Sequence, residues 1–283
     1  MSDPLSTRPV WQSVNRPEES VVLDAQGCCR SAAASGNPID SFYDSVAHVL
    51  TLGTPDALGA SATLGRLLTL GLVTATEAYF RSVLLATMTI CPVAKDLIAD
   101  QNLAYGALDY YGPDNLGLGL LEGVSFASES EVRKKSKQLL GLELAANKSL
   151  MAALQIYDQV CHMRHATVHA HGVLNRGNAR ALGVKPATET ICLVFDLAHL
   201  HNAAKACSSV VRAYNEHIWR LTVNRWVDQA LLTGQWQVDK HLFTPLFNTY
   251  RSELDKTAAK NASAAYASLR PTVIRRLGSR PES

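Results

Sequence analysis

Four of the nine histidines fall within ten residues of one another: His162, His165, His169 and His171. Arg164 lies among them. Histidine titrates near neutrality and can take or give a proton, whereas arginine stays charged and offers a planar fork to phosphate oxygens. A proton-transfer group beside a fixed cation is what metal-free cleavage of RNA requires. Residues 164–172, which read RHATVHAHG, are therefore the candidate functional centre.

Two other interpretations of this cluster stay open. Histidines in the last turn of a helix interact favourably with the helix dipole, and Arg164 would then pair with a carboxylate of the same protein. Alternatively His162, His165 and His169 share one face of a helix, and the last two could clamp a zinc ion. Against a metal, no Glu follows His165 as in hydrolytic zinc helices, and Arg164 beside it would repel a cation. We therefore expect neither a metal nor another cofactor.

The same residues resemble the motif of HEPN ribonuclease domains, which is Arg, a polar residue, three variable residues and His. Arg164, His165 and His169 match it in order and spacing. The continuation at 168–175, VHAHGVLN, resembles the extended form of one branch, in which a Gly and an apolar pair follow the His. Residues 77–81 (EAYFR) and 124–126 (VSF) also look like that branch, and the resemblance covers residues 64–232.

The resemblance implies a metal-independent endoribonuclease that leaves a 2′,3′-cyclic phosphate. Its substrate would be host or phage RNA, with tRNA as one candidate, in a defence or toxin role. Arg164 would hold the scissile phosphate and His169 would act as acid or base, while His165 would orient the site or bind RNA. Further RNA contacts are expected from His171, Asn175 and Arg176.

One Arg and one His are too few to supply an acid, a base and a phosphate-binding group together. We therefore expect a homodimer in which a two-fold axis brings two copies of each into one cleft. The alternative is a catalytically inactive helical module of a defence complex, which binds RNA or a partner such as an antitoxin or another defence-system protein. Burial of Arg164 and His169 inside one subunit would favour that module.

Helical periodicity dominates the chain and β-alternation is nearly absent. Long helices are predicted over 64–90, 145–171 and 198–232, with a short strand or the start of the next helix at 188–194. Gly172 stands where the helix over 145–171 should end. The apolar stripe of that helix is Leu150, Leu154, Tyr157, Cys161 and Val168. These patterns predict an all-α protein, a HEPN-like up-and-down bundle in one domain over residues 41–255.

Both ends of the chain differ in composition from this domain. Residues 1–40 are rich in Ser, Pro and Asn and predict a flexible N-terminal arm. From residue 256 onward six basic residues face one acidic residue, which predicts a basic C-terminal tail over 256–283 that adds salt-dependent RNA affinity. The six cysteines lack paired spacing, the start of the chain has no leader pattern, and no charge-free apolar run is long enough for a membrane. A cytoplasmic protein without membrane contact is expected.

Overall fold

The computed structural model describes residues 11, 22–31, 36–185, 188–255 and 259–279. The chain divides into two units, residues 1–34 and residues 35–283. Most of the predicted N-terminal arm over 1–40 lies outside the described residues, and the described part contains a 3-10 turn at Gln26–Cys28. The helical unit begins at residue 35, a few residues before the predicted start at 41.

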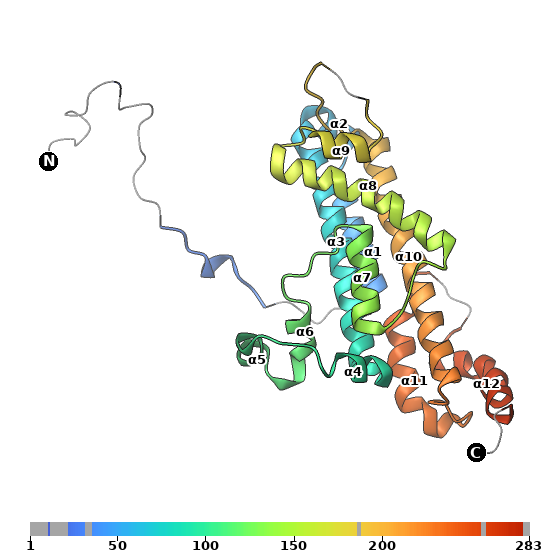
Figure 1. The fold of residues 1–283 in the computed structure, drawn as a ribbon. Coiled ribbons are helices and arrows are strands. Elements are labelled where there is room, and N and C mark those ends of the chain that lie inside the picture. Colours follow the sequence, from blue (N-terminus) through green and yellow to red (C-terminus); the bar gives the residue numbers. More distant parts are fainter. Residues whose placement is uncertain (1–10, 12–21, 32–35, 186–187, 256–258, 280–283) are drawn as a thin grey trace. The chain divides into compact units, whose positions relative to one another are not determined.

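The described part of the second unit is built from α-helices without a regular strand, so the prediction of an all-α protein is confirmed (Figure 1). In chain order the helices are α1 (Pro38–Leu52), α2 (Pro55–Ala60), α3 (Ala62–Ile90), α4 (Pro92–Ile98), α5 (Tyr105–Tyr111), α6 (Leu116–Leu120), α7 (Glu129–Leu140), α8 (Lys148–Ala170), α9 (Arg176–Ala181), α10 (Leu197–Asp228), α11 (Trp236–Tyr250) and α12 (Ala262–Gly278).

Polar side chains cap the first turns of the helices that carry the bundle. Ser128 Oγ accepts a hydrogen bond from the Glu131 amide over 3.2 Å at the start of α7. Asn147 caps α8 and Asp196 caps α10 in the same way. These bonds satisfy amide groups that have no partner within the helix, so each helix has a defined start.

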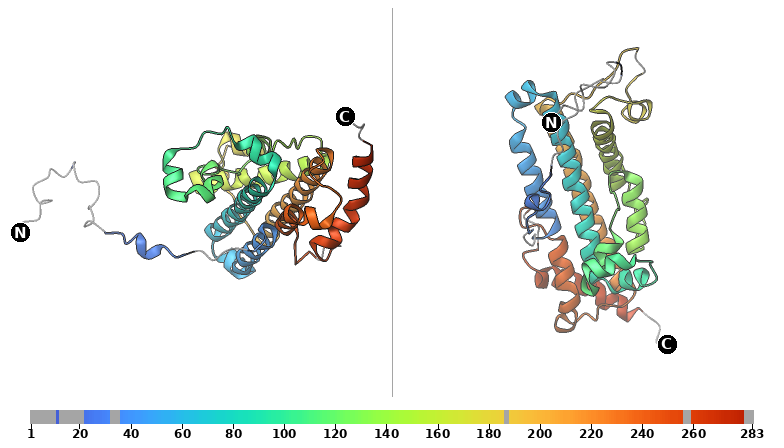
Figure 2. Two further views of the ribbon diagram at one scale, coloured as in Figure 1. Left: turned by 90° about the horizontal axis from the view of Figure 1, so that it is seen from below. Right: turned by 90° about the vertical axis from the view of Figure 1, so that its left-hand side faces the viewer.

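The core forms where α3, α8 and α10 meet. α3 packs against α1, α8, α10 and α11 and is the central helix of the unit (Figure 2). Its Phe80 ring is fully buried, with centroids 4.9 Å from the ring of Tyr214 on α10 and 6.0 Å from that of Tyr157 on α8. The buried Tyr214 hydroxyl lies 2.7 Å from Ser136 Oγ of α7, which satisfies both polar groups. This packing fixes the direction in which α8 leaves the core.

The two ends of the bundle carry different helices. α2, α9 and the C-terminal end of α8 lie at one end, whereas α11 and α12 lie at the opposite end (Figures 1 and 2). No helix among the described residues is both long and apolar enough to cross a membrane.

The predicted basic tail is in large part a helix of the bundle. Tyr266 and Val273 of α12 are buried in the common core. Arg270 Nε donates to the Gly234 carbonyl over 2.9 Å, and Arg276 pairs with Asp228 at 3.4 Å. The expectation of a tail over 256–283 is therefore wrong for residues 262–278, because one apolar face of this basic segment packs on α11 and α10. Residues 256–258 and 280–283 lie outside the described part.

One shorter segment also differs from expectation. Residues 188–194 form neither a helix nor a regular strand, and contribute one antiparallel bridge between Val173 and Cys192. Between α4 and α7, residues 105–123 contain α5, α6 and the 3-10 turn Pro113–Asn115.

Candidate functional site

The RHATVHAHG stretch occupies the C-terminal end of α8. The helix begins at its Asn147 cap and buries Tyr157, Val160 and Cys161 before it reaches the motif. It ends at Ala170, one residue earlier than predicted, because His171 already adopts a left-handed backbone with φ of 50°. Gly172 follows with φ of 89°, and its amide donates to the Ala166 carbonyl over 2.9 Å. The two residues together turn the chain sharply away from the helix.

A clamp from α3 holds this turn in place. Arg66 donates from Nη1 to the His171 carbonyl and lies 3.1 Å from Cys192 Sγ, while its Nη2 donates to Thr63 Oγ1 over 3.0 Å. The Leu193 amide donates to the Gly172 carbonyl over 2.9 Å from the other side. Sequence reasoning missed Arg66, because no local pattern links it to a residue more than a hundred positions later.

His165 and His169 form a pair on the exposed face of α8. Their ring centroids are 4.5 Å apart with the rings tilted by 49°, and both side chains are exposed. Partial loss of hydration, followed by the nearby charges of His169, His162 and Arg164, lowers the pKa of His165 below its usual value of 6.5. His165 is therefore neutral at pH 7 and can accept a hydrogen bond or a proton there.

Arg164 lies at the edge of the buried face of α8 and is half-buried. Its Nε atom is buried without a hydrogen-bond partner. Within the described part of the chain, Arg164 makes no ion pair with a carboxylate, so the pairing considered as a structural alternative is not observed there. A spacing of five residues places Arg164 and His169 about 7.5 Å apart along the axis and roughly 140° apart around it. One copy of α8 therefore presents the two residues on different sides.

His162 does not join the other histidines. Its Nδ1 lies 3.1 Å from Asn178 Oδ1 of α9, and its Nε2 lies 3.6 Å from Asp158 Oδ2 one turn earlier on α8. These contacts tie α9 to the motif helix and give the His162 imidazole structural partners. Among the described residues, no three His, Cys, Asp or Glu side chains come together as metal ligands.

The three residues predicted to contact RNA lie just beyond the motif. His171 is exposed at the end of α8, and Arg176 is exposed at the start of α9. Asn175 caps α9 with its Oδ1, which accepts from the Asn178 amide over 2.8 Å, so its oxygen already has a structural partner. His171 and Arg176 thus flank the turn that Gly172 begins.

A groove of about 710 Å³ opens beside this turn. Aliphatic side chains of Val173, Leu174 and Ile191 line it, and the Leu174 amide donates to the Ile191 carbonyl over 2.9 Å to join its two sides. Arg180 and Lys185 lie on its rim with Arg176. Sequence reasoning did not select Arg180 or Lys185, because only the return of residues 189–191 against 173–174 creates the groove.

The segments 77–81 and 124–126 meet in the structure. Glu77 Oε1 accepts hydrogen bonds from Ser125 Oγ over 2.8 Å and from the Phe126 amide over 2.7 Å. Arg81 Nη2 donates to the Val124 carbonyl over 2.7 Å. These charged residues of α3 fasten the loop that leads into α7, so their role in the structure is to hold the bundle together rather than to face the motif.

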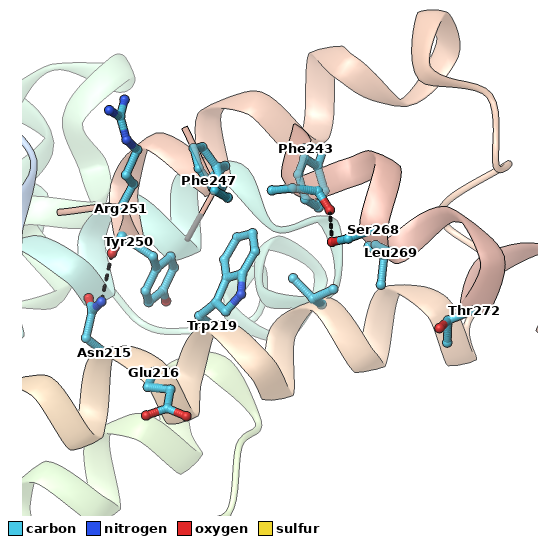
Figure 3. A pocket seen from close by; sticks show the side chains of 13 residues that line it. Asn215, Glu216, Trp219, Phe243, Phe247, Tyr250, Arg251, Ser268, Leu269 and Thr272 are labelled. Atoms are coloured by element: carbon cyan, nitrogen blue, oxygen red, sulfur yellow. Dashed lines mark hydrogen bonds between the residues drawn. The ribbon is translucent and has the colours of Figure 1, made fainter. Parts of the chain in front are cut away.

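A second hollow, of about 490 Å³, lies at the other end of the bundle between α10, α11 and α12 (Figure 3). Trp219 reaches from α10 toward α11, with ring centroids 5.9 Å from Tyr250 and 6.0 Å from Phe247. Asn215 Nδ2 donates to the Tyr250 carbonyl over 2.8 Å at its edge. None of the residues predicted for the site lines this hollow, and we leave it outside the candidate site.

No family model, no curated protein and no solved structure matches the chain.

Proposed function

We propose that this protein is a metal-independent endoribonuclease of HEPN type that acts on host or phage RNA, tRNA among the candidates, in a defence or toxin role. The observation that carries the proposal is the state of Arg164. It is half-buried with an unpartnered Nε and no ion pair among the described residues, and it neighbours an exposed histidine pair. A cation held without a carboxylate beside titratable side chains is suited to bind and stabilise a phosphate.

The proposed reaction is attack of the ribose 2′-oxygen on the adjacent phosphorus. The O2′–P bond forms, the P–O5′ bond breaks, and a 2′,3′-cyclic phosphate remains. One proton leaves the 2′-hydroxyl and another joins the departing 5′-oxygen. His169 serves one of these transfers, Arg164 neutralises the charge that gathers on the phosphate, and His165 orients the site as a neutral imidazole.

We further propose that the active form is a homodimer. Because Arg164 and His169 emerge on different sides of α8, a second copy related by a two-fold axis would supply the group that the first lacks. Exposed aliphatic side chains on the same helix support this: Ile156 is 52% exposed and Val168 is 47% exposed. Specific activity should then fall when the protein is diluted below the dissociation constant of the dimer. A monomer with full activity at nanomolar concentration would contradict the proposal that the dimer is the active form.

The test is incubation of the protein with total RNA in EDTA, followed by gel analysis. The parent should cleave, and His169→Ala should be slower by about 10² to 10⁴ because general acid–base groups contribute that much. His48→Ala is the matched control, since His48 is an exposed helical histidine on α1. Arg164→Lys should also lose activity relative to the parent, because the point charge of a lysine cannot reproduce the planar fork of the arginine.

Three results would count against this function. Loss of parent activity in EDTA, with His165→Ala as damaging as His169→Ala, would indicate a metal site. Cleavage that survives removal of His169 would assign the histidines a structural role. RNA binding without cleavage would indicate the catalytically inactive module.

A further inference from the structure

The groove beside α9 carries an excess of positive charge. Arg176, Arg180 and Lys185 are exposed on its rim, and Glu189 is the acidic residue that lines it. Arg176 and Arg180 are four residues apart on α9, so their side chains lie on one face of the helix. None of the three cations forms a hydrogen bond or ion pair through its side chain with the described residues.

The less exposed residues that line the groove are aliphatic and form its floor. Val173, Leu174 and Ile191 are half-buried there. Its volume of about 710 Å³ lies inside the range of roughly 300–1,000 Å³ in which proteins bind small ligands and parts of larger ones. A cationic rim over an aliphatic floor suits a chain that has anionic groups on one side and flat apolar faces on the other.

The groove lies next to the candidate site along the chain. Val173 follows His171 by two residues, with Gly172 between them. On the other side, the hydrogen bond between His162 and Asn178 ties α9 to α8. The groove therefore begins within two residues of the C-terminal turn of α8, and α9, which lines it, is tied to the same helix.

We propose that the groove between α9 and residues 189–191 binds an unpaired RNA segment that flanks the cleaved bond. This inference rests on the proposed ribonuclease function. Arg176, Arg180 and Lys185 contact backbone phosphates, and the aliphatic floor contacts the bases. The RNA is single-stranded, because a duplex turns its bases inward and is bound through its phosphates and sugars, which do not use such a floor.

The experiment measures the affinity of the full chain for a short fluorescent RNA by anisotropy. His169→Ala is the background, so that the RNA stays intact. The groove variant combines Arg176→Gln, Arg180→Gln and Lys185→Gln. The matched control combines three exposed lysines on other helices: Lys95→Gln, Lys148→Gln and Lys240→Gln. The same RNA annealed to its complement provides the duplex probe.

The groove variant should weaken binding of the unpaired RNA by up to about 100-fold at about 0.1 M salt, and should reduce the slope of log Kd against log salt by about 2. The control variant should change Kd less than twofold, and the duplex should bind more weakly than the unpaired RNA. Equal effects of the two triple variants, no binding at all, or a preference for the duplex would overturn the inference.

The two proposals fail separately. A parent that binds unpaired RNA through the groove without cleaving it refutes the ribonuclease and leaves the groove in place. A parent that cleaves RNA in EDTA, with no difference in affinity between the groove and control variants, refutes the groove and leaves the ribonuclease in place.

Discussion

Gly172→Ala should destabilise the protein more than its backbone angle alone predicts. A residue with a Cβ in the left-handed region costs about 1–2 kcal/mol, and Gly172 has φ of 89°. A Cβ there would also lie 2.5 Å from Arg66 Cδ and 2.8 Å from its Nη1. Arg66 would have to move and release the His171 carbonyl. Loss of that charged hydrogen bond adds about 1.5–3 kcal/mol, for a total of roughly 2.5–5 kcal/mol.

Chemical denaturation of a double-mutant cycle measures the two parts. Gly123→Ala is the matched control, because Gly123 has φ of 68° and nothing within 4 Å of a Cβ, and it should cost only about 1–2 kcal/mol. In an Arg66→Ala background, the loss of unfolding free energy caused by Gly172→Ala should fall to that of Gly123→Ala. If Gly172→Ala costs no more than Gly123→Ala, or costs the same with and without Arg66, the reasoning about the clamp is refuted.

Three further changes test other parts of the structure. His171→Gly should raise the unfolding free energy by roughly 0.5–1 kcal/mol in denaturant titration, since His171 has a left-handed backbone; an unchanged value would mean that its φ of 50° carries no strain. Asp239→Ala should lower the unfolding free energy by about 3–4 kcal/mol, because buried Asp239 accepts bonds from the Thr233 and Gly234 amides and from the Tyr266 hydroxyl; a loss below 1 kcal/mol would contradict that network. Burial, followed by the charge of Arg220, lowers the pKa of His217 below its usual 6.5. As the pH falls below 6.5, the unfolded chain binds this proton before the folded chain does, so the unfolding free energy should decline. In denaturant titrations at a series of pH values, His217→Gln should make this decline less steep.

Sequence periodicity predicted the long helices well, because their buried faces repeat over many turns. In α8 the stripe of Leu150, Leu154, Tyr157 and Cys161 is buried as expected. Val168 of the same stripe is 47% exposed, since the last turns of α8 extend past the core. The pattern of apolar residues on one helix cannot reveal where its neighbours end.

The C-terminal segment was harder to interpret for a different reason. Its many arginines suggested a tail, yet Tyr266 and Val273 provide enough apolar surface to pack α12 on the bundle. Arg270 is fixed to the Gly234 carbonyl and is therefore not part of a free basic arm. Composition averages over a segment, whereas packing depends on which side of the helix each residue occupies.

For the candidate site, the sequence identified the cluster but not its surroundings. The residue types and spacing placed His165 and His169 on one exposed face of α8, where the structure has them. That His162 turns toward Asn178, and that Arg66 holds the end of the helix, follow from contacts between distant parts of the chain. Such contacts leave no trace in local spacing.

The most direct test of the central claim is the chemistry of the RNA ends produced in EDTA, measured by mass spectrometry. Attack by the 2′-oxygen, with Arg164 and His169 as the working groups, predicts 2′,3′-cyclic phosphate and 5′-hydroxyl ends with the parent protein. It predicts that His169→Ala produces such ends more slowly by about 10² to 10⁴. Ends with a 3′-hydroxyl and 5′-phosphate, or cyclic phosphate ends of equal abundance from His169→Ala, would contradict the account.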